Sequence, residues 1–235
     1  MATEINLSQL PATATVTGAI YHVNISGVDY QAPQSTVEAS IKSAFQPDVS
    51  AFKRTGTTTF ESWYDGTLIP TTKGTNAAIN VDTLVLTPFI AGKTFNLDRI
   101  AVDITVAGVA SSVARLGIYE SSDIISSTLV VDSGAFVVDS TGVKSQTISI
   151  GLTAGKVYWL AFITNSSTGV SIRGYAANGA HYPNVLGNIG SGSSTTQGLA
   201  TTLTYGALPA DISAQTYSPV TTSSTMPSIS VRATV

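Results

Sequence analysis

Apolar and polar residues alternate in short stretches along most of the chain from residue 57 onward. This two-residue period is typical of β-strands that bury one face. The stretches cover residues 57–64, 80–87, 94–106, 112–119, 127–131, 135–138, 143–150, 156–164, 170–175, 199–205 and 227–235. Turn residues such as Ala154-Gly155 separate them, at the spacing of β-sandwiches and barrels. The alternation slips near Asp98, which predicts a bulge. We therefore expect a mainly β protein whose residues 48–235 form a jelly-roll-like antiparallel β-sandwich.

Residues 1–47 follow a different pattern and predict a small arm. Two alternating stretches flank Ser26-Gly27, a dipeptide that favours a tight hairpin turn. A capping-box spacing of Ser35 and Glu38 then predicts a short helix over residues 36–45. The apolar positions of this helix are Val37, Ile41, Ala44 and Phe45. Because a hairpin and one short helix bury little area, we expect the arm to need a partner, either a neighbouring copy or a docking surface.

The composition excludes several classes of function. Charged residues make up 11% of the chain, against about 25% in ordinary globular proteins. The net charge of −3 argues against nucleic acid, which needs a basic footprint. The chain has no cysteine, so disulfides and thiolate metal sites are excluded. No apolar run is long enough for a membrane helix. The first residues lack the features of a signal peptide, so we expect synthesis in a cytoplasm without the usual secretory route.

Catalytic constellations are weak in this sequence. The two histidines, His22 and His181, have no second histidine at metal-ligand spacing. No G-x-S-x-G nucleophile turn occurs, and the glycine-rich residues 187–198 contain no lysine for a phosphate loop. Six carboxylates are available for paired acid–base chemistry, and we interpret them as turn or rim groups: Glu61, Asp65, Asp98, Asp103, Glu120 and Asp123. We therefore predict no enzyme activity, no cofactor and no metal.

Aromatic residues near predicted loops are the candidates for binding. Trp63 and Tyr64 precede an Asp65-Gly66 turn, and such rings can stack on a sugar face; the alternative is a core or interface position. Loops of the glycine-rich kind commonly carry recognition. The candidate glycan or receptor contacts are Trp63, Tyr64, Tyr175, His181 and Tyr182. Trp159 lies in the middle of an apolar stretch and is predicted to be core.

Arg115 interrupts an apolar strand. A buried arginine needs an acidic partner, and we expect Asp103 or Glu120 to supply it.

Four stretches together resemble the proteins of tailed-bacteriophage virion surfaces. Residues 10–37 (LPATATVTGAIYHVNISGVDYQAPQSTV) are similar to the N-terminal segments of fibre and head-fibre proteins. Residues 95–123, 152–174 and 207–235 resemble, in the same order, the β-sandwich modules at the ends of such proteins. The resemblance rests on Arg99–Val102, Arg115–Tyr119, Gly155–Ala161 and Leu208–Arg232. Where the family has a Pro-Gly turn after the tyrosine strand, this chain has ESSDIISS.

The resemblance implies a non-enzymatic capsid decoration protein or short fibre. It would form a homotrimer, dock on capsid, neck or tail proteins through residues 1–47, and carry its sandwich outward, in possible contact with a host surface glycan. The residues expected to anchor the arm or the trimer are Leu10, Pro11, Tyr21, Val23, Val28, Tyr30, Val37, Ile41 and Phe45. Two other classes stay open: a carbohydrate-binding module outside a virion, and a sandwich enzyme such as a lyase or esterase.

Overall fold

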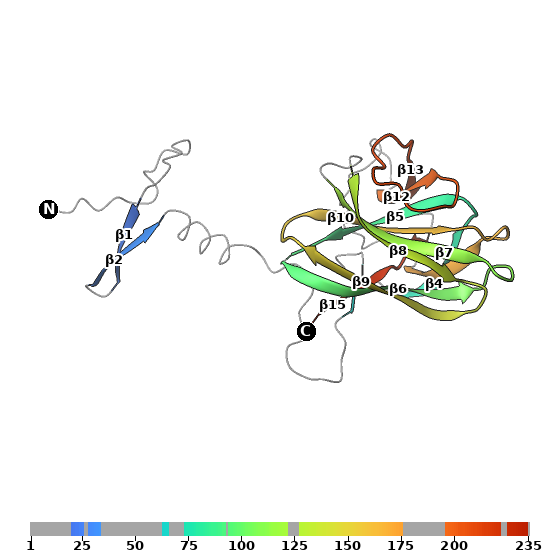
Figure 1. Cartoon of the computed structure of the whole chain (residues 1–235), viewed down its shortest axis with the longest axis horizontal. Helices are drawn as coiled ribbons and strands as arrows, with labels where there is room; N and C mark the ends of the chain where they lie inside the picture. Colours follow the sequence, from blue (N-terminus) through green and yellow to red (C-terminus); the bar gives the residue numbers. More distant parts are fainter. Residues whose placement is uncertain are drawn as a thin grey trace. The chain divides into compact units, whose positions relative to one another are not determined.

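The chain divides into two compact units, residues 1–47 and residues 48–235. The computed structural model describes residues 20–25, 28–33, 63–65, 73–92, 94–121, 127–175, 196–221 and 225–234. These residues form antiparallel strands joined by turns, with no helix among them (Figure 1). The prediction of a mainly β, antiparallel protein is therefore confirmed.

The first unit contains one antiparallel strand pair. Strand β1 (Ile20–Ile25) pairs with β2 (Val28–Pro33), and Val23 lies opposite Tyr30 in the register. Tyr21 and Val28 lie on the same two strands. The predicted helix over residues 36–45 lies outside the described residues, as do Leu10, Pro11, Val37, Ile41 and Phe45.

One sheet of the second unit has six strands in antiparallel order. From edge to edge they are β13 (Ser218–Thr221), β12 (Thr196–Thr202), β5 (Thr83–Ile90), β10 (Val157–Thr164), β7 (Val113–Ser121) and β8 (Ser127–Val137). Strand β5 begins later than the predicted residue 80, because Val81 and Asp82 form a turn in which Asp82 adopts a φ of 53°. The two stretches predicted at residues 127–131 and 135–138 are one strand, β8.

The other sheet has seven strands. Its main path runs β14 (Met226–Pro227), β11 (Val170–Tyr175), β6 (Phe95–Val106), β15 (Ser230–Ala233) and β3 (Trp63–Asp65), with β4 (Lys73–Ile79) paired to β11 and β9 (Gly142–Leu152) paired to β6. The pairing of β15 with both β6 and β3 confirms that residues 227–235 help to complete a sheet.

The two sheets pack face to face through a shared core, and we call this arrangement the sandwich. Its fully buried side chains alternate along the strands of both sheets, as a half-buried strand requires. They include Ile100 and Ile104 from β6, Leu116 and Ile118 from β7, and Leu160 and Phe162 from β10. The sandwich core is therefore built from the same apolar positions that the sequence pattern marked.

Strand β10 is buried on both faces, and the outer one is covered by residues 203–217, which we call the strap. The strap links β12 to β13, and its Leu208 and Ile212 pack on Trp159, Ala161 and Ile163 of β10. Trp159 is 1% exposed, so its predicted core position is confirmed, although it faces the strap rather than the opposite sheet. This second core was not predicted: the strand expected over residues 199–205 ends at Thr202, and residues 206–217 show no strand or helix period.

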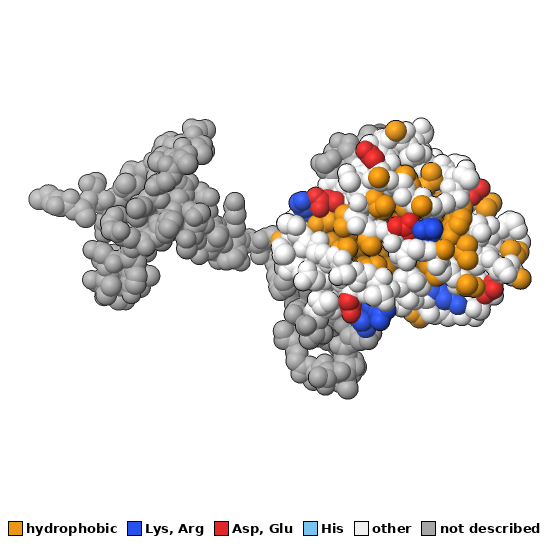
Figure 2. Space-filling view, in the orientation of Figure 1, with side chains coloured by type: hydrophobic (Ala, Val, Ile, Leu, Met, Phe, Trp, Pro, Cys, Tyr) orange, Lys and Arg blue, Asp and Glu red, His pale blue; other side chains and the backbone are white. Residues whose placement is uncertain are grey.

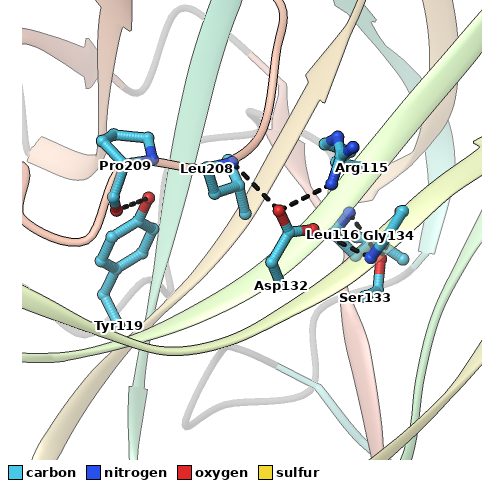
Figure 3. A network of polar contacts seen from close by, with 8 residues as sticks. All are labelled: Arg115, Leu116, Tyr119, Asp132, Ser133, Gly134, Leu208 and Pro209. Carbon is cyan, nitrogen blue, oxygen red and sulfur yellow. Dashed lines mark hydrogen bonds and ion pairs between the residues drawn. The ribbon is translucent and has the colours of Figure 1, made fainter.

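Hydrogen bonds fasten the strap to the far edge of the sheet. The backbone N–H of Leu129 in β8 donates to the Ala210 carbonyl (2.8 Å), and the Tyr119 hydroxyl donates to the Pro209 carbonyl (3.1 Å; Figure 3). Burial raises the pKa of Tyr119 and raises that of Tyr217 to about 12, so both hydroxyls remain donors at neutral pH. Leu208 packs directly on Gly117. A Cβ atom added to Gly117 would lie 2.2 Å from a methyl group of Leu208.

Asp132 is the centre of the polar network beneath the strap. One carboxylate oxygen accepts from the Arg115 guanidinium (2.7 Å) and from the Leu208 backbone N–H (3.0 Å), and the other accepts from the Gly134 N–H (2.9 Å; Figure 3). The predicted partners of Arg115 are therefore wrong. The bulged pairing of β7 with β8 places Asp132 opposite Gly117, two residues from Arg115.

Candidate functional site

A bulge in β6 brings two charged residues to the outer face of the seven-stranded sheet. The pairing of β6 with β9 shifts register between Leu97 and Arg99, which confirms the bulge predicted near Asp98. Leu97 and Ile100 are buried in the core, whereas Asp98 and Arg99 between them are only partly buried. The bulge therefore lets two consecutive polar side chains avoid the core.

Arg232 of β15 links Asp98 to Trp63. Its Nε and Nη2 donate to the two carboxylate oxygens of Asp98 at 2.8 and 2.6 Å. The centre of the same guanidinium lies 5.7 Å from the centre of the Trp63 ring, within the range of a cation–π contact. The register explains the alignment, because Arg232 pairs with Trp63 of β3 on one side and with Arg99 of β6 on the other. Three neighbouring strands thus carry one row of aromatic, cation and carboxylate.

A hollow of about 310 Å³ continues this row beyond Asp98. It is lined by Asn96, Leu97, Asp98, Ser149, Ile150, Gly151 and Thr234. Asn96 lies opposite Gly151 in the register of β6 and β9, and its carbonyl accepts the Thr234 backbone N–H at 2.9 Å. We call the hollow together with Asp98, Arg232 and Trp63 the outer strip.

The ion pair sets the charge state of the strip. The hydrogen bond from Arg232, followed by the charges of Arg232 and Arg99, lowers the pKa of Asp98 against the opposing effect of burial. Asp98 is therefore an ionised hydrogen-bond acceptor at neutral pH.

Replacing Arg232 with glutamine should raise the pKa of Asp98 toward its ordinary value. A carboxylate whose pKa is depressed by folding adds stability above its unfolded pKa of about 3.9 and loses it as the pH falls through the folded value. The stability difference between the two proteins should therefore be present at neutral pH and disappear in acid. Carboxyl-carbon NMR titration would measure the shift directly.

Asp211 is the internal control for that titration. Its pKa is lowered by hydrogen bonds from Ser213, so it should not change in the Arg232→Gln protein. An unchanged Asp98 pKa in that protein would show that Arg232 does not hold this carboxylate in solution.

The structure separates the residues predicted to contact a glycan. Trp63 belongs to the outer strip, whereas Tyr64 packs toward the core with its ring centre 5.8 Å from that of Phe95, because adjacent residues of a strand face opposite sides. Tyr175 is 1% exposed and its hydroxyl accepts from Ser228 at 3.3 Å, so its predicted surface role is wrong. His181 and Tyr182 lie outside the described residues.

The other described carboxylates weighed for catalysis also lie beside cations. Asp103 pairs with Arg173 at 3.1 Å, and Glu120 pairs with Lys156. Figure 2 shows acidic and basic side chains side by side on the face in view. Glu61, Asp123 and the side chain of Asp65 lie outside the described parts. In the described ranges, no group of three or more His, Cys, Asp or Glu residues is placed to hold a metal ion.

No protein-family model matches this chain, and no curated protein matches it. The described segments also contain no helix long and apolar enough to cross a membrane.

Sequence reasoning found Trp63 but missed the residues that surround it. Arg232 lay in a stretch identified only as a closing strand, and Asp98 was weighed only as a rim or catalytic carboxylate. The slip in alternation at Asp98 was the available signal, since it indicates a polar side chain displaced to the outer face.

Proposed function

We propose that this chain is a non-enzymatic structural protein of a tailed-phage virion surface, either a short fibre or a capsid decoration protein. Residues 1–47 anchor it to capsid, neck or tail proteins, and a jelly-roll-like sandwich faces outward, with host contact as a further role. The observation that carries the proposal is the division of the chain into a large unit with its own core and a small unit whose described part is a single strand pair. Two strands alone are marginally stable, and a docking partner would stabilise them.

The surface of the sandwich supports a structural role. Asp98, Asp103 and Glu120 are each neutralised by a basic side chain, whereas a catalytic acid–base pair needs carboxyls whose protonation is tuned to the reaction. The strap adds a second core to one sheet. Both features favour a stable external module that assembles in the host cytoplasm and is carried on the particle.

Deleting residues 1–47 should abolish attachment to particles and leave the sandwich folded. The reason is that residues 48–235 keep both hydrophobic clusters, while the proposed docking and trimer contacts are lost. Co-sedimentation with purified particles measures attachment, and analytical ultracentrifugation should show a trimer for the full chain and a monomer for the truncated one.

The full chain carrying Trp63→Ala is the matched control and should still attach. A truncated protein that still decorates particles would contradict the anchoring role. Cryo-electron microscopy of particles would then distinguish capsid decoration, with density between capsomers, from a tail or collar fibre.

A second candidate is a carbohydrate-binding module outside any virion. The outer strip favours it, because a half-buried aromatic beside hydrogen-bonding side chains suits a sugar. If the full chain associated with no particle, the result would favour a carbohydrate-binding module over a virion protein.

A further inference from the structure

The hollow of the outer strip is lined by groups that suit a hydroxyl-rich ligand. Asn96 offers an amide, Ser149 and Thr234 offer hydroxyls, and Asp98 offers a carboxylate, while the side chains of Leu97 and Ile150 pack toward the core. A volume of about 310 Å³ lies at the small end of ligand sites, which span about 300–1,000 Å³. A single sugar ring presents alternating hydroxyl groups and C–H surface to such a lining.

The charges of the lining select against anions. Asp98 is the one ionised side chain among the residues that line this hollow, and its carboxylate is turned toward Arg232 through one bond on each oxygen. A carboxylate has about four acceptor sites, so acceptor capacity remains for ligand hydroxyls. Arg232 is paired with Asp98, whereas Arg99 donates to the Thr147 hydroxyl, keeps its charge and is not among the lining residues. A sulfate or carboxylate group placed in the hollow would therefore have no cation among its lining contacts.

Trp63 extends the site to a second sugar ring. It lies on the far side of Arg232 from the hollow, with its ring 5.7 Å from the guanidinium carbon. Sugar C–H faces pack on aromatic rings, and the order Trp63, Arg232, Asp98, hollow crosses β3, β15, β6 and β9 in one direction. The strip therefore follows the length of an oligosaccharide rather than a single monosaccharide.

We propose that the outer strip binds a neutral oligosaccharide, with one pyranose ring in the hollow against Asp98 and Asn96 and a more distant ring of the same oligosaccharide on Trp63. This saccharide site would provide the host contact of the proposed function, and it rests on the proposed outward position of the sandwich. It is tested without particles, so its outcome is independent of the anchoring role of residues 1–47.

The decisive variant fills the hollow without removing a polar group. A Cβ added at Gly151 would lie 3.2 Å from the Asn96 side chain. A valine at this position therefore projects into the hollow, and valine suits a strand. The full chain would be titrated by calorimetry with neutral disaccharides and tetrasaccharides of glucose, galactose, mannose and N-acetylglucosamine, alongside sialylated and sulfated counterparts.

We expect at least one neutral tetrasaccharide to bind, and Gly151→Val and Asp98→Asn each to weaken it by about tenfold or more. Trp63→Ala should weaken the tetrasaccharide more than the disaccharide, because only the longer ligand reaches the ring. Asp139→Asn, in the loop after β8, is the matched control and should bind normally. Circular dichroism would establish that each variant is folded.

Three results would overturn the proposal. They are no binding across the neutral panel by the intact chain, binding that survives Gly151→Val in a folded protein, and binding confined to the anionic sugars. If saccharide binding fails while residues 1–47 still direct attachment, the anchoring role stands and only the ligand assignment falls.

Discussion

Replacing Trp159 with alanine should lower the free energy of unfolding of the sandwich by about 3–5 kcal/mol. The ring is 1% exposed and lies between β10 and the strap, where it packs with Leu208 and Ile212. Its removal deletes a large apolar surface and leaves a cavity. The six-stranded sheet and the strap cannot move together to fill it, because hydrogen bonds hold the strap in place. Urea denaturation followed by far-ultraviolet circular dichroism measures the change through the midpoint and slope.

The chain supplies its own control for this substitution. Trp63 is the other of its two tryptophans, and it lies on the outer face, where its contact with Arg232 is worth about 1 kcal/mol or less. Trp63→Ala should therefore cost much less stability than Trp159→Ala. Equal losses would mean that the strap does not enclose Trp159 in solution.

Replacing Asp132 with alanine should lower the free energy of unfolding by about 3 kcal/mol and loosen the strap selectively. The change leaves the half-buried Arg115 guanidinium without its partner and removes the acceptor of the Leu208 and Gly134 backbone N–H groups. Stranding one member of such a pair is expensive, because the remaining charge keeps its desolvation cost. Hydrogen exchange should show the Leu208 amide losing protection before the amides of β10 do.

Asp139→Ala makes the same chemical change in an exposed loop. Asp139 accepts one bond, from the Ser111 backbone N–H at 3.1 Å, so its loss should cost about 1 kcal/mol or less. If Asp132→Ala were no more damaging than Asp139→Ala, the network of Figure 3 would not be what holds the strap.

The strands were predictable wherever one local pattern decided the structure. Strand β10 combines β-branched and aromatic residues with a preceding Ala154-Gly155 turn, and its position, type and burial agree with the prediction. The bulge at Asp98 was readable because a slip of one residue moves every later side chain to the other face.

The strap and the outer strip were not predictable, because distant contacts decide both. Leu208 and Ile212 have no periodic neighbours, and their burial depends on the apolar outer face of β10. That face was itself a signal, since a strand that is apolar on both sides needs a cover on each. Arg232 and Trp63 meet only because β15 lies between β6 and β3, an order that no local pattern contains.

The pairing of β3 with β15 also dictates the order of events during synthesis. Trp63 finds its strand partner only when Arg232 has been made, and Trp159 stays uncovered until residues 203–217 leave the ribosome. Each sheet therefore needs strands from the end of the chain before it is complete. Closing such distant contacts is slow and leaves apolar surface bare in the meantime. The growing chain therefore exposes apolar surface until the last strands are made, and a product that ends before residue 203 would leave the outer apolar face of β10 uncovered.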